Sequence, residues 1–284
     1  MAAGLEADST NRVAVIGAGS WGTALAMVAA RNQHTVRLWA REPEVSKENN
    51  RIRRNPFYLS DFELPENIRA TTAVEEAVEG ADFVLLVVPS HPMREMAASL
   101  RPHLNSEIVL VSAAKGVENN TLMRMEEVVA DVLRDSFEPQ YVALSAPSFA
   151  LEVAKGDPAA IVAASLNRGS SEMIQRSLSS ASFRVYTNTD VAGVELGGAG
   201  KNVVAIAAGV VRGLGFGTNA VGAIITRGLA EMTRLALARG ARAETMAGLA
   251  GLGDLVLTCT GELSRNRYVG IELGRGRKLA EILG

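Results

Sequence analysis

The sequence predicts an α/β protein in which a doubly wound parallel sheet is followed by an all-helical C-terminal domain. Three observations predict it: short apolar runs rich in β-branched residues, helical patterns between them, and a change after Asp190 to a sequence with helical spacing and no convincing strand. Strands that are buried on both faces give unbroken apolar runs, and their alternation with helices indicates a parallel sheet. The expected strands are Val13–Ile16, Thr35–Trp39, Phe83–Val88, Ile108–Ser112, Val142–Ser145 and Ile161–Ala164, with Phe183–Tyr186 as one more.

Helical patterns separate several of these strands and then dominate the chain. From Val191 to Ala243 the sequence is rich in Ala, Gly, Val and Leu at helical spacing, and the glycines indicate close backbone packing. Residues 1–11 are expected to form a disordered tail, residues 12–190 the sheet domain and residues 191–284 the helical domain. The expected helices of the sheet domain include Gly22–Arg31, Val74–Glu79, Met93–Leu100 and Thr121–Leu133.

The bulk composition narrows the function classes. Of the 284 residues 48% are hydrophobic and 21% charged, as in ordinary globular proteins. The net charge of −2 gives no general attraction to nucleic acid, so any anion site must be local. The longest apolar run, Val203–Val211, is too short to cross a bilayer, the single Cys259 excludes an internal disulfide, and no secretory signal is visible. A cytoplasmic protein without membrane insertion or a nucleic-acid partner is expected.

A glycine motif follows the first expected strand. Gly17, Gly19 and Gly22 have the spacing G-x-G-x-x-G between that strand and a helix. There the first glycine permits a tight turn, the second lets the backbone approach a pyrophosphate, and the third lets the helix pack on the strand. The helix N-terminus supplies N–H groups to the phosphates. We therefore expect a Rossmann-like, dinucleotide-binding domain, with a glycine-rich turn of another α/β protein as the alternative.

The residues after the second strand bear on the choice of cofactor. NAD sites usually place an acid about 20 residues beyond the glycines, where it binds the ribose hydroxyls. In this chain Arg41 comes first and Glu42 follows. Because a guanidinium could pair with a 2′-phosphate, NADP is favoured over NAD. The alternative is that both residues are solvated loop charges.

Ligands of open α/β sheets lie beyond the carboxyl ends of the strands, where Lys115 is found. This lysine follows the strand Ile108–Ser112 and is expected to reach into the ligand cleft. The alternative is a surface lysine whose stem lies along apolar neighbours. His91 is a candidate base by residue type alone, and an ordinary loop histidine is an equally good interpretation, so it is given no catalytic role.

Lys201 is a stronger candidate for a functional residue than Lys115 or His91. It lies in an otherwise apolar helical stretch, where a lone lysine costs stability unless it is paired or used. Gly197, Gly198, Ala205 and Ala208 fall on its side of the helix, so that face is expected to let a ligand lie beside the ammonium. The opposite stripe is expected to face the core and contains Val203, Ala207 and Val210.

A third cluster lies near the C-terminus. Asp254 stands between glycine turns, and Ser264 precedes Arg265 and Asn266. Ser264 is a good helix N-cap, and a helix start with arginine and asparagine can bind a phosphate or a carboxylate. The alternatives are a plain capped helix with exposed arginines and a simple turn aspartate, although Asp254 could also orient a lysine or bind a hydroxyl.

These segments, in this order, resemble the bacterial-type NAD(P)-dependent glycerol-3-phosphate dehydrogenases. The likeness covers nearly the whole chain after the tail, and its later motifs are more specific than the glycine triplet. The matching pieces are Gly17–Ala26, Ala114–Gly116, Pro147–Ala150, Glu195–Val203, Ile225–Met232 and Gly253–Asn266.

The resemblance implies hydride transfer between NAD(P)H and dihydroxyacetone phosphate, which gives sn-glycerol 3-phosphate for glycerophospholipid synthesis. It implies that Lys201 gives and takes the proton, with Lys115 and Asp254 as catalytic partners and with no metal. The residues implied to hold the small phosphorylated substrate are Lys115, Ala146, Ser148, Lys201, Asp254, Ser264, Arg265 and Asn266. The residues implied to hold the cofactor are Gly17, Gly19, Ser20, Trp21, Gly22, Arg41, Lys115, Ala150 and Arg265.

The chain departs from the family at two points. Ala146 stands where the family has glycine, and an alanine would be strained there if the backbone needs a positive φ. The chain also ends at Gly284, whereas family members continue through further helices, so a truncated helical domain is expected.

Two other functions stay open at this point. A related two-domain hydroxyacid or ketopantoate-type dehydrogenase should lack the Asp254 and Ser264–Asn266 segments, and a catalytically silent nucleotide-binding module should lack turnover. The small-residue surface Gly209–Ala223 is a candidate for packing within one subunit or between the subunits of a homodimer.

Overall fold

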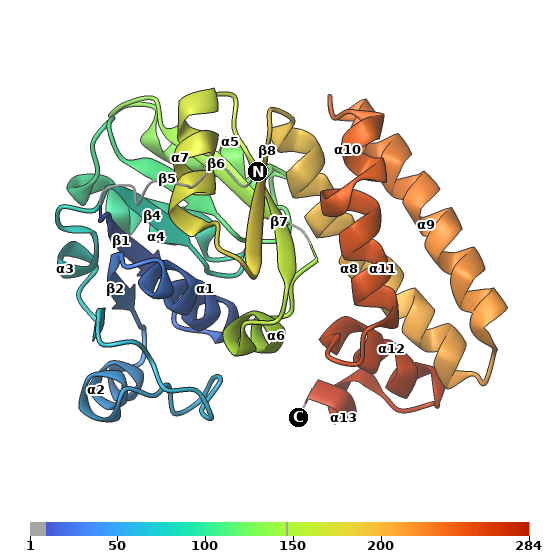
Figure 1. The fold of residues 1–284 in the computed structure, drawn as a ribbon. Helices are drawn as coiled ribbons and strands as arrows, with labels where there is room; N and C mark the ends of the chain where they lie inside the picture. Colours follow the sequence, from blue (N-terminus) through green and yellow to red (C-terminus); the bar gives the residue numbers. More distant parts are fainter. Residues whose placement is uncertain (1–9, 146, 284) are drawn as a thin grey trace, which may run out of the picture. The chain divides into compact units, whose positions relative to one another are not determined.

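The computed structural model describes residues 10–145 and 147–283, which form two compact units. The sheet unit contains residues 10–144 and 149–189, and the helical unit contains residues 145, 147–148 and 190–283 (Figure 1). The helical unit begins for its main part at residue 190, where the residue pattern of the sequence changes. Residues 145, 147 and 148 group with the helical unit, although they lie inside the range expected for the sheet domain. That each unit folds as an independent domain stays a prediction.

The sheet unit is built on eight strands in the order β3-β2-β1-β4-β5-β6-β7-β8. The pairings β1–β2, β1–β4, β2–β3, β4–β5, β5–β6 and β7–β8 are all parallel. The order reverses between β1 and β4, as in doubly wound folds, and this confirms the predicted fold class. The strands are β1 (Arg12–Ile16), β2 (Thr35–Trp39), β3 (Ile68–Thr71), β4 (Phe83–Leu86), β5 (Val109–Ser112), β6 (Gln140–Ser145), β7 (Ala159–Ala164) and β8 (Phe183–Asn188).

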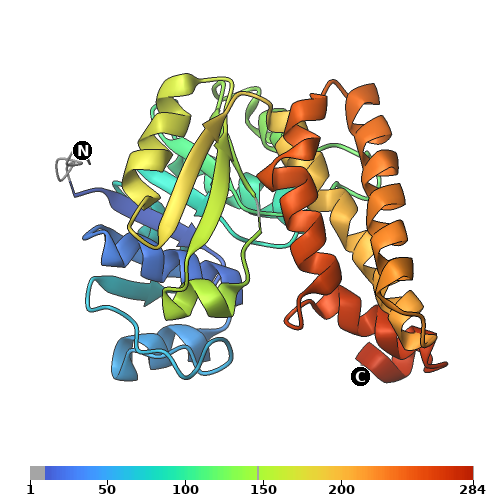
Figure 2. The same cartoon turned by 45° about the vertical axis from the view of Figure 1, so that its right-hand side comes forward.

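Helices cover both faces of the sheet, which is why the central strands are apolar throughout. Every side chain of β4 and β5 is buried, and so are the last four of β1. Helix α1 packs against α6 and α7, while α4 packs against α3 and α5 (Figures 1 and 2). The helices are α1 (Ser20–Arg31), α2 (Pro43–Ile52), α3 (Val74–Val78), α4 (Met93–Leu100), α5 (Met125–Leu133), α6 (Ala150–Lys155) and α7 (Arg168–Leu178), with a 3₁₀ turn at Arg101–His103.

Several elements differ from the sequence expectations. The strand β3 and the helices α2 and α7 were not predicted, because Arg69 interrupts the apolar pattern of β3 and both helices are mainly polar. Helix α5 begins at Met125 rather than at Thr121. The backbone N–H of Arg124 donates to the Glu127 side chain at 2.7 Å, and Leu122 has a left-handed φ of 57°, so the helix cannot extend further toward the N-terminus.

The expected disordered tail, residues 1–11, includes a residue that is ordered in the structure. Residues 1–9 lie outside the described part of the chain, but Asn11 is fixed to the sheet unit. Its backbone oxygen accepts from the N–H of Thr35 at 3.0 Å, and its amide Nδ2 donates to Ser177 Oγ at 2.9 Å. Asn11 is therefore ordered, although it lies within the range expected for the tail.

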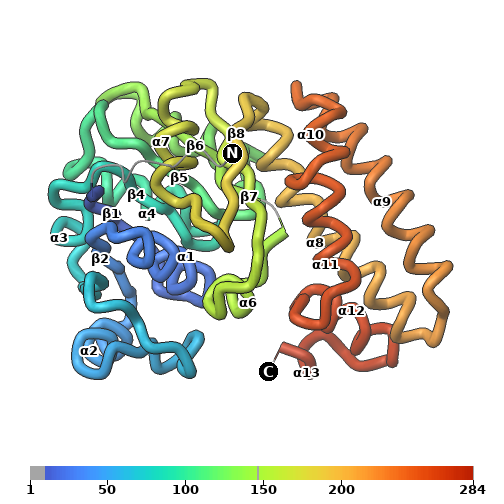
Figure 3. Tube along the Cα trace, in the orientation of Figure 1, coloured from blue at the N-terminus to red at the C-terminus, as the bar shows by residue number. Residues whose placement is uncertain are grey.

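The helical unit is organised around the long helix α8 (Val191–Gly213). Helix α8 packs against α9 (Thr218–Ala238), α11 (Asp254–Thr260) and α12 (Arg265–Gly274), and the tube in Figure 3 shows the paths of these helices. Asp190 caps α8, because its Oδ1 accepts from the N–H of Gly193 at 2.9 Å. The remaining elements are α10 (Ala243–Ala247), a π-helical turn (Leu249–Gly253) and α13 (Leu279–Leu283).

Glycines on the small-residue side of α8 pack against neighbouring helical segments. A Cβ placed on Gly197 would lie 2.4 Å from the carbonyl oxygen of Ala250, and one on Gly209 would lie 2.2 Å from that of Arg267. The expectation that this face would be open to a ligand is therefore wrong along these contacts. The expectation for the opposite stripe is also wrong, since Val203 is 72% exposed.

By length and composition α8 is also the one helix of the described residues that could cross a membrane. Its most apolar window has a mean hydropathy of 1.3, and 44% of that window is buried within the structure. It carries the buried Glu195 and Lys201 and packs against α9, α11 and α12. These features are those of a core helix, in agreement with the expectation that the chain does not insert into a membrane.

Candidate active site

The ends of four strands meet at one edge of the sheet unit. Ile16 at the end of β1 is in register with Trp39 and Leu86, and Leu86 is in register with Ser112. The segments that follow these strands therefore leave the sheet side by side, as the ligand-binding segments of doubly wound sheets do. The predicted cofactor residues that lie on them are Gly17, Gly19, Ser20, Trp21 and Gly22 after β1, Arg41 after β2 and Lys115 after β5.

The glycine turn after β1 has the geometry that the motif predicts. Gly17 has a φ of +119°, and a Cβ there would lie 2.5 Å from the carbonyl oxygen of Val87. A Cβ on Gly22 would lie only 1.7 Å from the carbonyl oxygen of Gly17. At Gly19, by contrast, an added Cβ would meet nothing within 4 Å. Gly17 and Gly22 thus permit the turn and its close packing, while Gly19 faces open space.

The start of α1 offers hydrogen-bond donors that fit a dinucleotide. Its N-cap is Gly19, which has no side chain to accept from the first turn, and that turn carries no acidic residue. The indole Nε1–H of Trp21 is buried without an acceptor among the described residues. An unpaired buried donor costs free energy, and an uncapped helix start attracts an anion. These observations fit the pyrophosphate of a bound dinucleotide.

A buried asparagine missed from the sequence holds a second loop against this turn. Asn55 has no exposed surface, and its Nδ2 donates to the carbonyl oxygen of Ala18 at 2.8 Å and to Thr23 Oγ1 at 2.9 Å. Its Oδ1 accepts from the N–H groups of Phe57 and Tyr58, whose side chains are exposed. Asn55 therefore fixes this aromatic loop beside the glycine turn. The Asn-Pro dipeptide marked a turn in the sequence, but its partner lies 37 residues away.

Arg41 is exposed and paired with its neighbour. Its Nε and Nη2 donate to Glu42 Oε1 at 3.0 Å and 2.8 Å, and its side chain is 82% exposed. An ion pair this exposed contributes little stability, so Arg41 can exchange Glu42 for another anion at small cost. The exposed position of Arg41 therefore fits both interpretations that the sequence left open, binding of a 2′-phosphate and a solvated loop charge.

Two more predicted residues belong to the sheet unit. Lys115 is half-buried in the loop after β5, and Ala150 is the first residue of α6 after its N-cap Phe149. Gly116 has a φ of +159°, and a Cβ there would lie 2.4 Å from Ser90 Oγ, so the loops after β4 and β5 touch beside Lys115. Ala146, predicted to contact the substrate, lies outside the described residues.

In the helical unit Lys201 and Asp254 form a buried ion pair. Lys201 is 7% exposed in the middle of α8, Asp254 is fully buried at the first residue of α11, and Lys201 Nζ donates to Asp254 Oδ1. Asp254 follows the π-helical turn directly, and its backbone carbonyl oxygen accepts from Thr258 Oγ1 at 2.6 Å. The buried ammonium of Lys201 is therefore paired, as its cost in free energy requires.

Asn266 contacts α8 at Asn202, the residue directly after Lys201, which was not singled out from the sequence. Its Nδ2 donates to the Oδ1 of Asn202, which follows Lys201 on α8, at 2.8 Å. Ser264 caps α12 through a bond from the N–H of Arg267 at 3.2 Å, and Arg265 is exposed at the first turn. The start of α12 is thus tied to the helix that carries Lys201.

The segment that contains Ser148 lies beside the turn before Asp254. A Cβ on Gly253 would lie 3.1 Å from Cγ of Pro147, the residue before Ser148. The helical unit therefore contains predicted substrate residues from distant parts of the chain, namely Ser148, Lys201, Asp254, Ser264, Arg265 and Asn266. Among the described residues no cluster of His, Cys, Asp and Glu side chains could hold a metal ion.

Cys259 is buried near Lys201 and has an altered acidity. Burial raises the pKa of the Cys259 thiol from 9.0 to about 11, against a smaller opposite effect of the Lys201 charge. The neutral thiol is the stabilised form in the folded state. The resulting contribution to stability is therefore complete below pH 9.0 and is lost as the pH rises toward about 11.

We expect the Cys259 thiol to be inert in the native protein. Because the thiolate is the reactive form, a disulfide reagent at pH 8 should react slowly with folded protein and stoichiometrically after unfolding in urea. Release of the coloured thiol product measures both rates. Immediate stoichiometric reaction of the native protein would contradict the buried, protonated state of Cys259.

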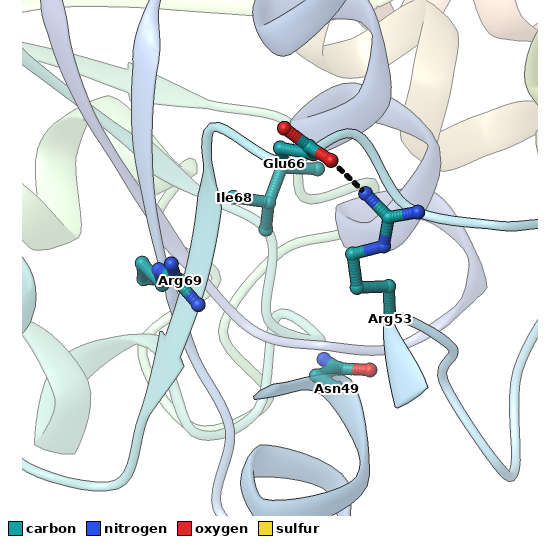
Figure 4. Close-up of a pocket in the computed structure, with 5 residues that line it drawn as sticks. All are labelled: Asn49, Arg53, Glu66, Ile68 and Arg69. Carbon is teal, nitrogen blue, oxygen red and sulfur yellow. Dashed lines mark hydrogen bonds and ion pairs between the residues drawn. The ribbon is translucent and has the colours of Figure 1, made fainter. Parts of the chain in front are cut away.

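One cavity of about 340 Å³ lies away from all of these residues. It is lined by the C-terminal half of α2 and the beginning of β3, at the end of the sheet opposite the carboxyl edge. Figure 4 shows the ion pair between Arg53 Nη1 and Glu66 Oε1, 2.8 Å long, beside the buried Asn49. No residue predicted to bind cofactor or substrate lines this cavity.

Two family profiles match the chain. One is described as the N-terminus of NAD-dependent glycerol-3-phosphate dehydrogenase and matches residues 12–171, and the other is described as its C-terminus and matches residues 190–284. The chain belongs to the NAD-dependent glycerol-3-phosphate dehydrogenase family. The resemblance stated from the sequence motifs is thereby confirmed.

Individual relatives agree with this assignment. The glycerol-3-phosphate dehydrogenase (NAD(P)+) of Koribacter versatilis is 56% identical over 274 residues, which are 96% of this chain and 81% of the relative. The corresponding protein of Geobacter sulfurreducens is 54% identical over 275 residues, 97% of this chain and 82% of the relative. The crystal structure of glycerol-3-phosphate dehydrogenase from Coxiella burnetii matches with a TM-score of 0.91 and 41% identity, over 96% of this chain and 83% of that one.

Proposed function

We propose that this chain catalyses reversible hydride transfer between NAD(P)H and dihydroxyacetone phosphate, with sn-glycerol 3-phosphate as the product of reduction. The observation that carries the proposal is the buried pair of Lys201 and Asp254 in a chain that also has the dinucleotide turn Gly17–Gly22. The names of the relatives supply the substrate. The product would feed glycerophospholipid synthesis.

The sheet unit supplies the cofactor site in this proposal. Gly17, Gly19 and the first turn of α1 hold the pyrophosphate, and the buried indole N–H of Trp21, which has no acceptor among the described residues, is a further donor for the cofactor. We assign NADP as the preferred cofactor because the exposed guanidinium of Arg41 can leave Glu42 for a 2′-phosphate. Ala150 and Lys115 are further cofactor residues of the sheet unit, and the sequence motifs also imply Arg265 of the helical unit. When bound, the nicotinamide supplies or accepts the hydride.

Lys201 moves the proton in this mechanism. During reduction its Nζ donates a proton to the C2 oxygen of the substrate, and in the reverse direction the same nitrogen accepts it. Asp254 holds the ammonium in one place through the buried pair. Lys115 stabilises the charge that develops on the oxygen.

The start of α12 anchors the phosphate of the substrate. Arg265 and Asn266 lie in the first turn after the cap Ser264, where backbone N–H groups and the guanidinium can bind an anion. Ala146 and Ser148 belong to the proposed substrate site as well. Binding of the remote phosphate orients the carbonyl carbon, so part of the binding energy lowers the barrier of the chemical step.

Replacement of Arg265 by alanine should raise the KM for dihydroxyacetone phosphate by about tenfold or more, because a charge-assisted contact contributes about 1.5–3 kcal/mol. Steady-state rates at saturating cofactor measure this effect. The matched control is Arg234→Ala, which removes an exposed arginine of α9 that pairs with Glu231 and should leave the KM unchanged. An unchanged KM in Arg265→Ala would contradict the proposed phosphate site.

The proposed reaction is tested by following cofactor absorbance with three substrates. NADPH and NADH are each mixed with dihydroxyacetone phosphate, with unphosphorylated dihydroxyacetone and with ketopantoate. The proposal predicts oxidation with the phosphorylated substrate, faster with NADPH, and little with the other two. Preferred reduction of ketopantoate would support the related hydroxyacid class of dehydrogenase and overturn the proposal.

A homodimer and a cytoplasmic location are further parts of the proposal. The apolar side chains of Val203, Leu214 and Phe216 on the helical unit are each more than half exposed, and contact between subunits would cover such side chains. Sedimentation equilibrium measures the mass directly. A single species of 30.0 kDa at micromolar concentration would exclude the dimer.

A further inference from the structure

The loop that carries Lys115 is a closed structure of its own. We call residues 113–124 the Lys115 loop. Within it Val117 and Arg124 form an antiparallel bridge, and the N–H of Glu118 donates to the carbonyl oxygen of Met123 at 2.9 Å. The N–H of Leu122 donates back to the carbonyl oxygen of Glu118 at 2.9 Å. The part of the loop after Lys115 is therefore closed by its own backbone hydrogen bonds.

One guanidinium ties this loop to two helices. Arg94, in the first turn of α4, donates through Nε and Nη2 to the two carboxylate oxygens of Glu118 at 2.8 Å and 3.0 Å. Its Nη1 donates to Asp131 Oδ2 on α5 at 2.5 Å. The fork geometry fixes the orientation of the guanidinium as well as its position. Arg94 thus links α4, the Lys115 loop and α5 within the sheet unit.

The charges of this cluster are held in their ionised forms. Hydrogen bonds from Arg94 and Thr121 keep the pKa of the Glu118 carboxyl below its usual value, and the bond from Arg94 also lowers the pKa of Asp131. Only 14% of the Glu118 side chain is exposed, so solvent competes little for its contacts. The Arg94 cluster therefore stays intact at neutral pH.

Two more contacts lie close to Lys115 in the sequence, one directly after it and one before it. Gly116 packs on Ser90 so closely that an added Cβ would lie 2.4 Å from the serine Oγ. Upstream, the N–H of Ala113 donates to the carbonyl oxygen of Leu86 at 3.0 Å. Lys115 is thus held between the end of β5 and the Arg94 cluster, three residues before Glu118.

We propose that Arg94 is a positioning residue for Lys115, which it acts on through the bidentate contact with Glu118. The inference rests on the proposed function, because it takes Lys115 as the group that contacts substrate and cofactor. Arg94 lies on α4 and belongs to neither the glycine turn nor the phosphate site. Displacement of a catalytic group by about 1 Å can cost on the order of 10²-fold in rate, so a loosened loop should slow the reaction.

The first test compares two arginines that share Asp131. Arg94→Ala should lower kcat/KM for dihydroxyacetone phosphate by about tenfold, within the range expected for a misplaced catalytic group. Arg134→Ala removes an exposed arginine that contacts Asp131 Oδ1 at 3.0 Å but not Glu118, and it should change kcat/KM by less than about twofold. Arg94→Lys should restore part of the loss, because lysine keeps the charge and loses the fork. Equal effects of Arg94→Ala and Arg134→Ala would overturn the inference.

A double-mutant cycle separates positioning from general loosening. If Arg94 acts through Lys115, the double variant Arg94→Ala/Lys115→Ala should be no slower than Lys115→Ala alone. If the two losses multiply instead, Arg94 does not act through Lys115 and the inference is wrong. Thermal unfolding on the same samples should show Arg94→Ala folded at the assay temperature. Full activity of Lys115→Ala would contradict the proposed role of Lys115 itself, and is thereby distinguishable from a failure confined to Arg94.

Discussion

Replacement of Lys201 by methionine should lower kcat by about 10³-fold while NADPH binding is retained. Positioned general acids contribute roughly 10²–10⁴-fold to rate, and in the proposed mechanism no other group gives the C2 oxygen its proton. Methionine keeps most of the buried stem of the lysine and removes the charge. The glycine turn belongs to the sheet unit, so cofactor affinity should stay within about twofold. Single-turnover rates and NADPH fluorescence titrations measure the two effects.

The stability of this variant needs its own control. Lys201→Met removes the ammonium that donates to the fully buried Asp254 carboxylate, and breaking a buried pair costs about 3–5 kcal/mol. The double variant Lys201→Met/Asp254→Asn removes both charges, so it should regain most of this stability and remain inactive. Retention of near wild-type turnover in either variant would contradict the assignment of Lys201.

Replacement of Gly209 by alanine should destabilise the helical unit by about 3 kcal/mol. Alanine normally favours a helix over glycine by about 1 kcal/mol, but a Cβ here would lie 2.2 Å from the carbonyl oxygen of Arg267 and 2.8 Å from Cα of Gly270. Both obstacles are backbone atoms of α12, so the two helices must separate. Urea unfolding followed by far-ultraviolet circular dichroism gives the change in the free energy of unfolding.

The matched control for Gly209 is Gly222 on α9. An added Cβ at Gly222 would meet nothing within 4 Å, so Gly222→Ala should raise the free energy of unfolding by about 0.5–1 kcal/mol. The two substitutions are chemically identical and both lie within helices. If both changed stability by the same amount and sign, the close approach of α8 and α12 would not exist in solution.

The sheet was largely predictable because its chemistry is local. The apolar runs of β1, β4 and β5 follow from burial on both faces, and the turn at Gly17 follows from a backbone conformation that favours glycine. The edge strand β3 escaped prediction because the exposed Arg69 interrupts its apolar pattern. Local patterns indicate buried strands well and short edge strands poorly.

The orientation of α8 was not predictable from its composition. A face of glycine and alanine allows close approach by a ligand or by another helix, and the residue types do not distinguish the two. In the structure Gly197 and Gly209 meet backbone atoms of the π-helical turn and of α12. Only the tertiary structure shows that Gly197 and Gly209 contact helical segments.

Lys201 and Asp254 could be singled out from the sequence as candidates, but the contact between them could not be predicted. Lys201 stood out as a charge in an apolar helix, and Asp254 as one that could orient a lysine, yet they are 53 residues apart in the sequence. The partners of Asn55 and Asn266 are 37 and 64 residues away, and no periodicity connects them. The catalytic and binding roles of all these residues stay predictions until they are measured.

The most direct measurement of the proposed function follows the fluorescence of NADPH bound to the wild-type protein. NADPH is first titrated until its fluorescence shows that it is bound, and dihydroxyacetone phosphate is then added to the same sample. We predict a rapid loss of the reduced-cofactor signal with formation of sn-glycerol 3-phosphate, which mass spectrometry identifies. Persistence of bound, unoxidised NADPH after the addition would contradict the proposal and indicate a nucleotide-binding module without catalysis.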